Sequence, residues 1–164
     1  GPPDVVELTL ALAREMVAAA GLGDVDPADR LADGSAMDSW RQMIAAQGGD
    51  PDADLPAARE TDVVLAPADG VLLSLDALAV GIAAWRLGAG RSRKEDPVSA
   101  GAGVVVHAKP GAAVRAGEPL LTLHADEPAR FATARAALAD AVVIGPPGSR
   151  PPEQPLVLDR VGTG

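Results

Sequence analysis

The chain of 164 residues contains no cysteine and no asparagine, and its aromatic residues are limited to Trp40, Trp85 and Phe131. Without cysteine, a disulfide framework and a thiolate metal site are excluded. The same absence is typical of a reducing compartment, so we expect a cytoplasmic protein. Because aromatic residues make up only 2% of the chain, leucine, valine and alanine must fill the interior.

Positive charge is also scarce. Lysine and arginine together number 14 against 23 aspartates and glutamates, which gives a net charge of −9. Nucleic acids and anionic membranes both attract a basic surface, so neither is expected as a partner. No apolar run approaches the length of a membrane span, and no signal peptide opens the chain. The sequence begins Gly-Pro-Pro rather than with methionine, which predicts a truncated or processed chain.

The first fifty residues have the pattern of helices. Asp4 and Glu7 predict a capping box directly after two prolines. A second, short helix is predicted to begin at Asp26, and a third is capped by Ser35. Apolar residues recur every three or four positions and predict buried faces. These faces are Val5, Leu8, Leu12 and Met16 in the first helix, and Met37, Trp40 and Ile44 in the third.

Beyond Glu60 the periodicity changes to that of a β-rich domain. The predicted strands are residues 61–65, 71–75, 104–108, 120–124, 142–144 and 156–161. One helix is predicted to begin at Asp76, and a last helix opens at Glu127 and Pro128. Their inward faces are expected to be Leu78, Ile82 and Trp85 in the former, and Phe131, Ala134 and Leu138 in the latter.

Several sequence blocks occur together in the order of one known family. They are Gly1–Leu8, Met43–Pro51, Ala66–Val71, Asp76 with Ala77, Leu87–Arg91, Asp96–Val98, and then Gly111, Val114, Gly117, Leu120, His124 and Ala125. Together they resemble the thymidine phosphorylase (pyrimidine-nucleoside phosphorylase) family. Its C-terminal domain has an Asp-Ala helix ending Leu-Gly-x-Gly-Arg, followed by a Gly-x-x-Val-x-x-Gly-x-x-Leu hairpin ending His-Ala. The resemblance covers essentially the whole chain.

The resemblance implies phosphorolysis, in which phosphate attacks C1′ of a pyrimidine 2′-deoxynucleoside and releases the base and 2-deoxyribose 1-phosphate. It also implies no organic cofactor, and a homodimer formed through an N-terminal helical domain. The family's Lys-His-Ser-Thr-Gly-Gly-Val-Gly-Asp run, whose backbone N–H groups cradle an oxyanion, has no counterpart in this sequence. We therefore expect no catalytic, substrate-binding or metal-binding residue here. Phosphate and nucleoside would bind through the missing N-terminal region, and this fragment alone would be monomeric and inactive.

The segment Gly88–Arg91 has the composition of a phosphate loop but follows a predicted helix. Phosphate loops precede a helix, where the free N–H groups and the positive end of the dipole lie. Gly88 is therefore interpreted as a helix C-cap. The basic residues expected to neutralise this helix end are Arg91, Arg93 and Lys94. Glu95 and Asp96 are the expected partners of Arg91.

Parts of the sequence also have the pattern of a biotinyl or lipoyl carrier domain. Such a carrier needs an acceptor lysine at a hairpin tip between small or methionine residues. The two lysines, Lys94 and Lys109, lie among charges and beside a proline. A sandwich architecture without a prosthetic group is therefore favoured. A non-catalytic binding or carrier module remains an alternative, as does a stand-alone remnant with a structural role.

Two residue groups have the composition of metal ligands. His107 and His124 could meet across paired strands, but no third histidine and no cysteine accompanies them, so structural histidines are expected. Asp24, Asp26 and Asp29 lack the glycine and the terminal glutamate of a helix–loop–helix calcium site. Capping of a helix by Asp26 explains that aspartate sufficiently.

These patterns predict an α+β chain with three parts. Residues 1–50 form a helical segment that belongs to a larger α/β domain of the parent enzyme. Residues 51–59, rich in proline and aspartate, form a boundary loop. Residues 60–164 form a β-rich domain of the α/β-hammerhead type, similar to a barrel sandwich.

Overall fold

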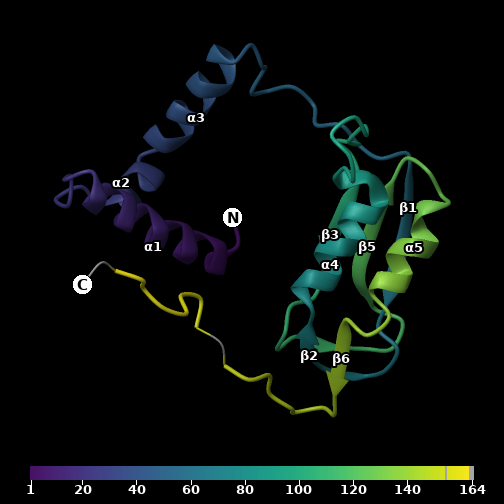
Figure 1. Ribbon diagram of the computed structural model, residues 1–164. Helices are drawn as coiled ribbons and strands as arrows, with labels where there is room; N and C mark the ends of the chain where they lie inside the picture. Colours follow the sequence, from purple (N-terminus) through teal and green to yellow (C-terminus); the bar gives the residue numbers. More distant parts are fainter. Residues whose placement is uncertain (154, 163–164) are drawn as a thin grey trace. The chain divides into compact units, whose positions relative to one another are not determined.

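The computed structural model describes residues 1–153 and 155–162 of an α+β chain. The chain forms two compact units: Gly1–Asp54 with the C-terminal residues from Glu153, and Leu55–Pro152. The first contains α1 (Pro3–Ala19), α2 (Pro27–Ala32) and α3 (Ser35–Ala46). The second contains β1 (Glu60–Leu65), β2 (Gly70–Leu75), α4 (Ala77–Ala84), the π-helical turn η1 (Trp85–Ala89), β3 (Gly103–Val106), β4 (Ala113–Val114), β5 (Pro119–Ala125), α5 (Arg130–Ala137) and β6 (Val142–Gly145) (Figure 1).

The helices of the first unit bury none of their residues. The predicted stripe of α1 is therefore wrong as a buried face, and Met16 at its C-terminal end is 72% exposed. The periodic spacing identifies an apolar face correctly, but it does not show whether another element covers that face. The predicted capping box is also wrong, because the N-cap of α1 is Pro2, two residues before Asp4, and it makes no side-chain cap hydrogen bond.

An aspartate lies just before each of the helices α2 and α3, namely Asp26 and Asp33. Asp26 caps α2 as predicted, and its Oδ1 accepts a hydrogen bond from the Ala28 N–H at 3.0 Å. At α3 the predicted Ser35 cap is wrong, because Gly34 is the N-cap, without a side-chain cap hydrogen bond, and Ser35 is the first residue of the helix. Asp33 Oδ1 accepts from both the N–H of Ser35, at 2.8 Å, and its hydroxyl, at 2.6 Å.

The second unit is built on two three-stranded antiparallel sheets, in the orders β1-β5-β3 and β4-β2-β6. Helices α4 and α5 contact each other, and α4 contacts β3 while α5 contacts β5 (Figure 1). On β5, Leu121 and Leu123 are fully buried, whereas Thr122 and His124 between and after them are only partly buried. This alternation is that of a strand with one face toward the core.

Leucine, valine and alanine form the core, as the lack of aromatic residues predicts. The buried hydrophobic residues are Ala66, Val71, Leu72, Ala83, Leu87, Ala108, Val114, Leu120, Leu121, Leu123, Ala125, Ala134, Leu138 and Ala141. Phe131 is partly buried against this cluster. The inward face predicted for α5 is therefore confirmed.

Helix α4 begins as predicted but presents a different face. Asp76 is its N-cap, with Oδ1 accepting from the Ala79 N–H at 2.8 Å. Leu78 and Trp85, predicted to face inward, are 74% and 43% exposed, while Ala83 and Leu87 are fully buried. Nearly every residue of α4 is apolar, so periodicity cannot select one face, and the small side chain of Ala83 allows closer packing.

The strand predicted at residues 156–161 is wrong, since residues 155–162 form no strand. Alternating apolar residues form a strand only where a second strand supplies hydrogen-bond partners. Within the described ranges no strand pairs with this segment. No helix in the described part of the chain is both long and apolar enough to cross a membrane.

Candidate functional site

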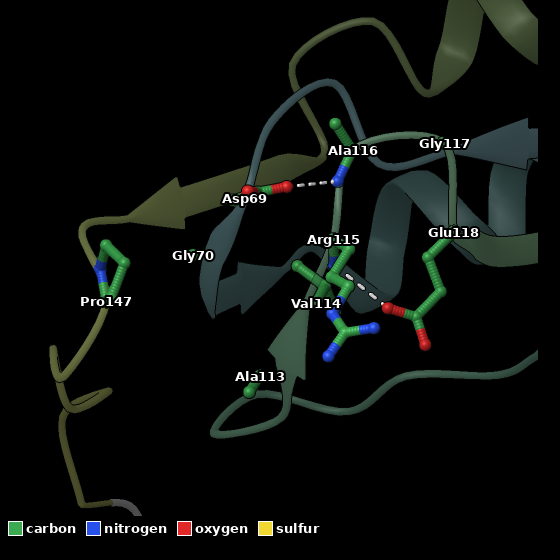
Figure 2. Close-up of a pocket in the computed structure, with 9 residues that line it drawn as sticks. All are labelled: Asp69, Gly70, Ala113, Val114, Arg115, Ala116, Gly117, Glu118 and Pro147. Atoms are coloured by element: carbon green, nitrogen blue, oxygen red, sulfur yellow. Dashed lines mark hydrogen bonds between the residues drawn. The ribbon is translucent and has the colours of Figure 1, made fainter.

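The first candidate site is a pocket of about 760 Å³ beside the turns that join β1 to β2 and β4 to β5 (Figure 2). Its lining residues are Asp69, Gly70, Ala113, Val114, Arg115, Ala116, Gly117, Glu118 and Pro147. Three of these carry charge, so their hydrogen bonds decide whether the pocket offers free polar groups.

Both carboxylates of this pocket bind backbone N–H groups (Figure 2). Asp69 Oδ1 accepts from the Ala116 N–H at 2.8 Å, which joins two turns that lie 47 residues apart in sequence. Glu118 Oε2 accepts from the Arg115 N–H at 2.8 Å. These contacts hold the turns in place, so we interpret this pocket as structural.

The second candidate site is a cavity of about 740 Å³ beside η1 and α5. Its lining residues are Trp85, Arg86, Gly90, Ser92, Asp96, Pro97, Arg130 and Thr133. A smaller cavity of about 240 Å³ shares Pro97 and Arg130 with it. Both cavities adjoin the segment that has the composition of a phosphate loop.

Gly88 breaks the helix, as the C-cap interpretation predicts. Its φ of 113° and ψ of 5° lie in a region that favours glycine. Its carbonyl accepts from the Ser99 N–H at 2.9 Å, which closes the loop between the two residues. The loop therefore leaves the carbonyl end of a helix and returns to it, unlike a phosphate loop.

Within this loop the N–H groups that could hold an anion are already occupied by a carboxylate. Asp96 Oδ2 accepts from the N–H of Ser92 at 3.2 Å and of Arg93 at 2.9 Å. The predicted pairing of Arg91 with Glu95 or Asp96 is wrong. Arg91 Nη1 instead donates to the Lys94 carbonyl at 3.3 Å, because Asp96 is directed toward the backbone.

The base of the loop is fixed by Asp126, directly after β5. Its Oδ2 accepts from the Ser99 hydroxyl at 2.5 Å, and its Oδ1 accepts from the Arg59 N–H at 3.3 Å. The hydrogen bond from Ser99 is the main reason why the pKa of Asp126 is lowered, followed by the bond from Arg59. An ionised Asp126 thus joins the boundary segment, the loop and the sheet.

The two histidines do not form a site. His107 Nε2 lies 2.7 Å from Thr122 Oγ1, and the backbone N–H of His107 donates to the Leu120 carbonyl. His124 pairs with Gly103 at the other end of the same sheet. Leu120, which lies opposite His107, and His124 are four positions apart along β5, or roughly 13 Å.

The remaining sequence-based candidates are likewise not brought together. In the described residues, no three histidine or acidic side chains gather in a metal-binding cluster. Lys94 and Lys109 are both exposed, in the loop and in a turn, without the flanking residues of a carrier lysine. What the sequence did not indicate is the side-by-side placement of Trp85, Arg86 and Arg130, since no motif joins η1 to α5.

Comparison with known proteins identifies the family. Residues 71–145 match the family model described as the pyrimidine nucleoside phosphorylase C-terminal domain. Over 161 residues the chain is 52% identical to a thymidine phosphorylase of Mycobacterium tuberculosis H37Rv, covering 98% of this chain and 37% of that protein. It is 35% identical over 164 residues to human thymidine phosphorylase, covering 88% and 34%, respectively. A pyrimidine-nucleoside phosphorylase of Staphylococcus epidermidis is 35% identical over 135 residues, covering 76% and 31%.

The chain thus spans about a third of the length of the curated relatives that it matches. The matched family model is that of a C-terminal domain, and none of these names indicates a biotinyl or lipoyl carrier. The chain belongs to the thymidine phosphorylase (pyrimidine-nucleoside phosphorylase) family and corresponds to its C-terminal part, as the sequence blocks predict.

Proposed function

We propose that this chain is the C-terminal part of an enzyme that phosphorolyses pyrimidine deoxynucleosides, with thymidine as the first substrate to test. The observation that carries the proposal is 52% identity to a thymidine phosphorylase along 98% of this chain. In the reaction the glycosidic bond at C1′ breaks and a bond from C1′ to a phosphate oxygen forms. The products are the free base and 2-deoxyribose 1-phosphate.

Within that enzyme the role of this chain is architectural. Catalysis of such a displacement needs an oxyanion cradle and donors to the departing base. The sequence contains no Lys-His-Ser-Thr-Gly-Gly run, and the N–H groups of Ser92 and Arg93 are bound to Asp96. Phosphate and nucleoside therefore bind to residues outside this chain, and no residue of the chain is assigned as catalytic, substrate-binding or metal-binding.

The proposed architecture is that of an α/β-hammerhead domain, similar to a barrel sandwich. Two antiparallel sheets with α4 and α5 support it. We place this domain at residues 60–164, the boundary loop at 51–59, and a helical segment of a larger α/β domain at 1–50. The parent enzyme would be a cytoplasmic homodimer without an organic cofactor, and this chain alone a monomer.

A chimera tests the proposal directly. This chain would replace the matching third of the M. tuberculosis thymidine phosphorylase, and thymine release from thymidine and phosphate would be followed. We expect activity within about tenfold of the parent, because the chemistry resides in the retained part while this chain restores the domain's position. The parent enzyme without this segment and the isolated chain serve as controls, and neither should release thymine above the uncatalysed rate.

A folded chimera without activity would contradict the assignment of this chain to that enzyme class. Thymine release by the isolated chain would instead contradict the architectural role and place catalytic residues within it. A biotinyl or lipoyl adduct on Lys94 or Lys109, detected by mass spectrometry of protein from its natural host, would support the carrier alternative.

A further inference from the structure

The cavity beside η1 and α5 combines an aromatic side chain with two arginines. Trp85 is 43% exposed, although the nearby residues Ala83 and Leu87 are fully buried. Arg86, its neighbour in η1, and Arg130, the first residue of α5, are both half-buried and line the same cavity. A volume of about 740 Å³ is within the range of small-molecule sites.

The indole of Trp85 is supported on one side by the loop. A Cβ built on Gly90 would lie 2.9 Å from Trp85 Cδ1. Glycine at this position therefore allows the ring to rest against the loop backbone. Trp85 lines the cavity, where its indole can stack against a flat ring.

Arg86 is fixed in position without being neutralised by a carboxylate. Its Nη1 donates to the Thr133 carbonyl of α5 at 2.8 Å, and no ion pair of Arg86 is found among the described residues. Guanidinium has five N–H donors, so this bond leaves others for an anion. Arg130 Nη2 binds Glu127 Oε1 at 3.1 Å, which holds the second guanidinium beside the cavity.

The charged residues that line the cavity are Arg86, Arg130 and Asp96, a net charge of +1, while the chain has a net charge of −9. Arg130 forms an ion pair with Glu127. The acidic lining residue, Asp96, already accepts two backbone N–H groups. An anionic ligand in this cavity is therefore attracted chiefly by Arg86.

We propose that this cavity binds a phosphate monoester that carries a flat ring, such as a nucleoside 5′-monophosphate, with the ring on Trp85 and the phosphate on Arg86 and Arg130. Arginine binds phosphate through paired N–H donors, and nucleobases stack on aromatic side chains. The existence of this site does not depend on the proposed phosphorolytic activity.

The test is a titration of the full chain with thymidine 5′-monophosphate. In a Trp40→Phe background, Trp85 is the remaining tryptophan, and its fluorescence should be quenched in a saturable manner. Calorimetry of the unmodified chain gives the affinity independently. Thymidine can use only the stacking surface of Trp85, and orthophosphate can use only the two arginines. We therefore expect each to bind at least about tenfold more weakly than thymidine 5′-monophosphate.

Variants then identify the residues involved. Arg86→Gln should weaken binding of the nucleotide by about tenfold or more, since one charged donor set is lost. Arg130→Gln is a second variant, which leaves the contact of Arg86 with Thr133 intact. Trp85→Leu removes the stacking surface, and its nucleotide affinity is measured by calorimetry. Arg115→Gln, beside the other pocket, is the matched control and should bind normally. Circular dichroism establishes that each variant is folded.

Three results would overturn the proposal. One is the absence of saturation up to about 10 mM nucleotide, beyond the range of a specific site. The second is unchanged affinity in folded Arg86→Gln and Trp85→Leu chains. The third is equal affinity for orthophosphate and the nucleotide, which would show that the ring is not recognised.

Discussion

Arg135 of α5 binds Asp62 of β1 through two hydrogen bonds, from Nε to Oδ2 at 2.6 Å and from Nη2 to Oδ1 at 2.7 Å. Nη2 also donates to the Val63 carbonyl at 2.8 Å. The two side chains are 73 residues apart in sequence. This paired contact joins the first strand of the β-rich unit to its last helix.

The contact predicts a pH-dependent contribution to stability. The hydrogen bond from Arg135 is the main reason why the pKa of Asp62 lies below its ordinary value in the folded chain. A carboxylate with a lowered pKa stabilises the fold above its unfolded pKa and loses this effect as pH falls through its folded pKa. We expect Asp62→Asn to reduce the free energy of unfolding at pH 7 by about 1 kcal/mol, since Arg135 is partly exposed.

The measurement is urea denaturation at pH 7 and at pH 3. The difference in free energy of unfolding between the unsubstituted chain and Asp62→Asn should be smaller at pH 3. At that pH Asp62 is increasingly protonated in the unsubstituted chain, so its ionic contact with Arg135 contributes less. Asp140→Asn, an exposed position, is the control and should change stability little. An equal loss at both pH values would contradict an ionic origin of the effect.

Two glycines of the β-rich unit should respond to alanine in opposite directions. A Cβ on Gly70 would lie 2.1 Å from the Gly145 carbonyl oxygen, whereas nothing lies within 4 Å of one on Gly81 in α4. Gly70→Ala should therefore destabilise by about 3 kcal/mol through overpacking. Gly81→Ala should stabilise by about 0.5–1 kcal/mol, because alanine favours a helix interior. Thermal unfolding compares the pair, and equal effects would show that the β2–β6 contact is looser than described.

Gly88 tests the cost of backbone conformation without a steric clash. Its φ is 113°, yet the nearest atom to an added Cβ is Ser99 Cβ at 3.6 Å. Gly88→Ala should cost about 1–2 kcal/mol from the backbone alone, and Gly88→Val more. Gly103→Ala is the control, since this glycine has open space and no positive φ. Denaturation curves for Gly88→Ala and Gly103→Ala that coincide would contradict the assigned conformation of Gly88.

Limited proteolysis should cut the boundary loop and release a resistant fragment. We expect cleavage between residues 48 and 54 and protection from about Leu55. The boundary backbone is held closely after that point: a Cβ on Gly101 would lie 2.5 Å from the Ala58 nitrogen, and the Arg59 N–H donates to Asp126. Mass spectrometry locates the cut. Earlier cleavage between Gly88 and Val98 would show that the loop, rather than the boundary, is the weaker segment.

Local signals in the sequence predicted the β-rich unit well. Alternating Leu and Val located five of its six strands, and Asp76 marked the start of α4 because capping depends on neighbouring residues. The two-residue strand β4 was missed because a pattern of period two cannot be recognised over so short a run. The family itself followed from several blocks in order.

Features that depend on distant residues could not be predicted. The outward position of Trp85 results from the packing of Ala83 and Leu87 on the sheet, which an all-apolar helix does not reveal. The predicted strand at 156–161 lacked a partner, and sequence periodicity contains no information on partners. Arg86 and Arg130 meet at one cavity through the contact of η1 with α5, without any shared motif.

The hydrogen bond between the Ser99 N–H and the Gly88 carbonyl has an evolutionary consequence. Because it closes the segment at its base, the exposed residues 92–95 can change their side chains while both ends of the loop stay in place. The contacts of Asp96 there are with the backbone N–H groups of Ser92 and Arg93, so they do not depend on those side chains. The chain therefore keeps its leucine-rich core and its most replaceable side chains in separate stretches of sequence, so selection can act on one while leaving the other unchanged.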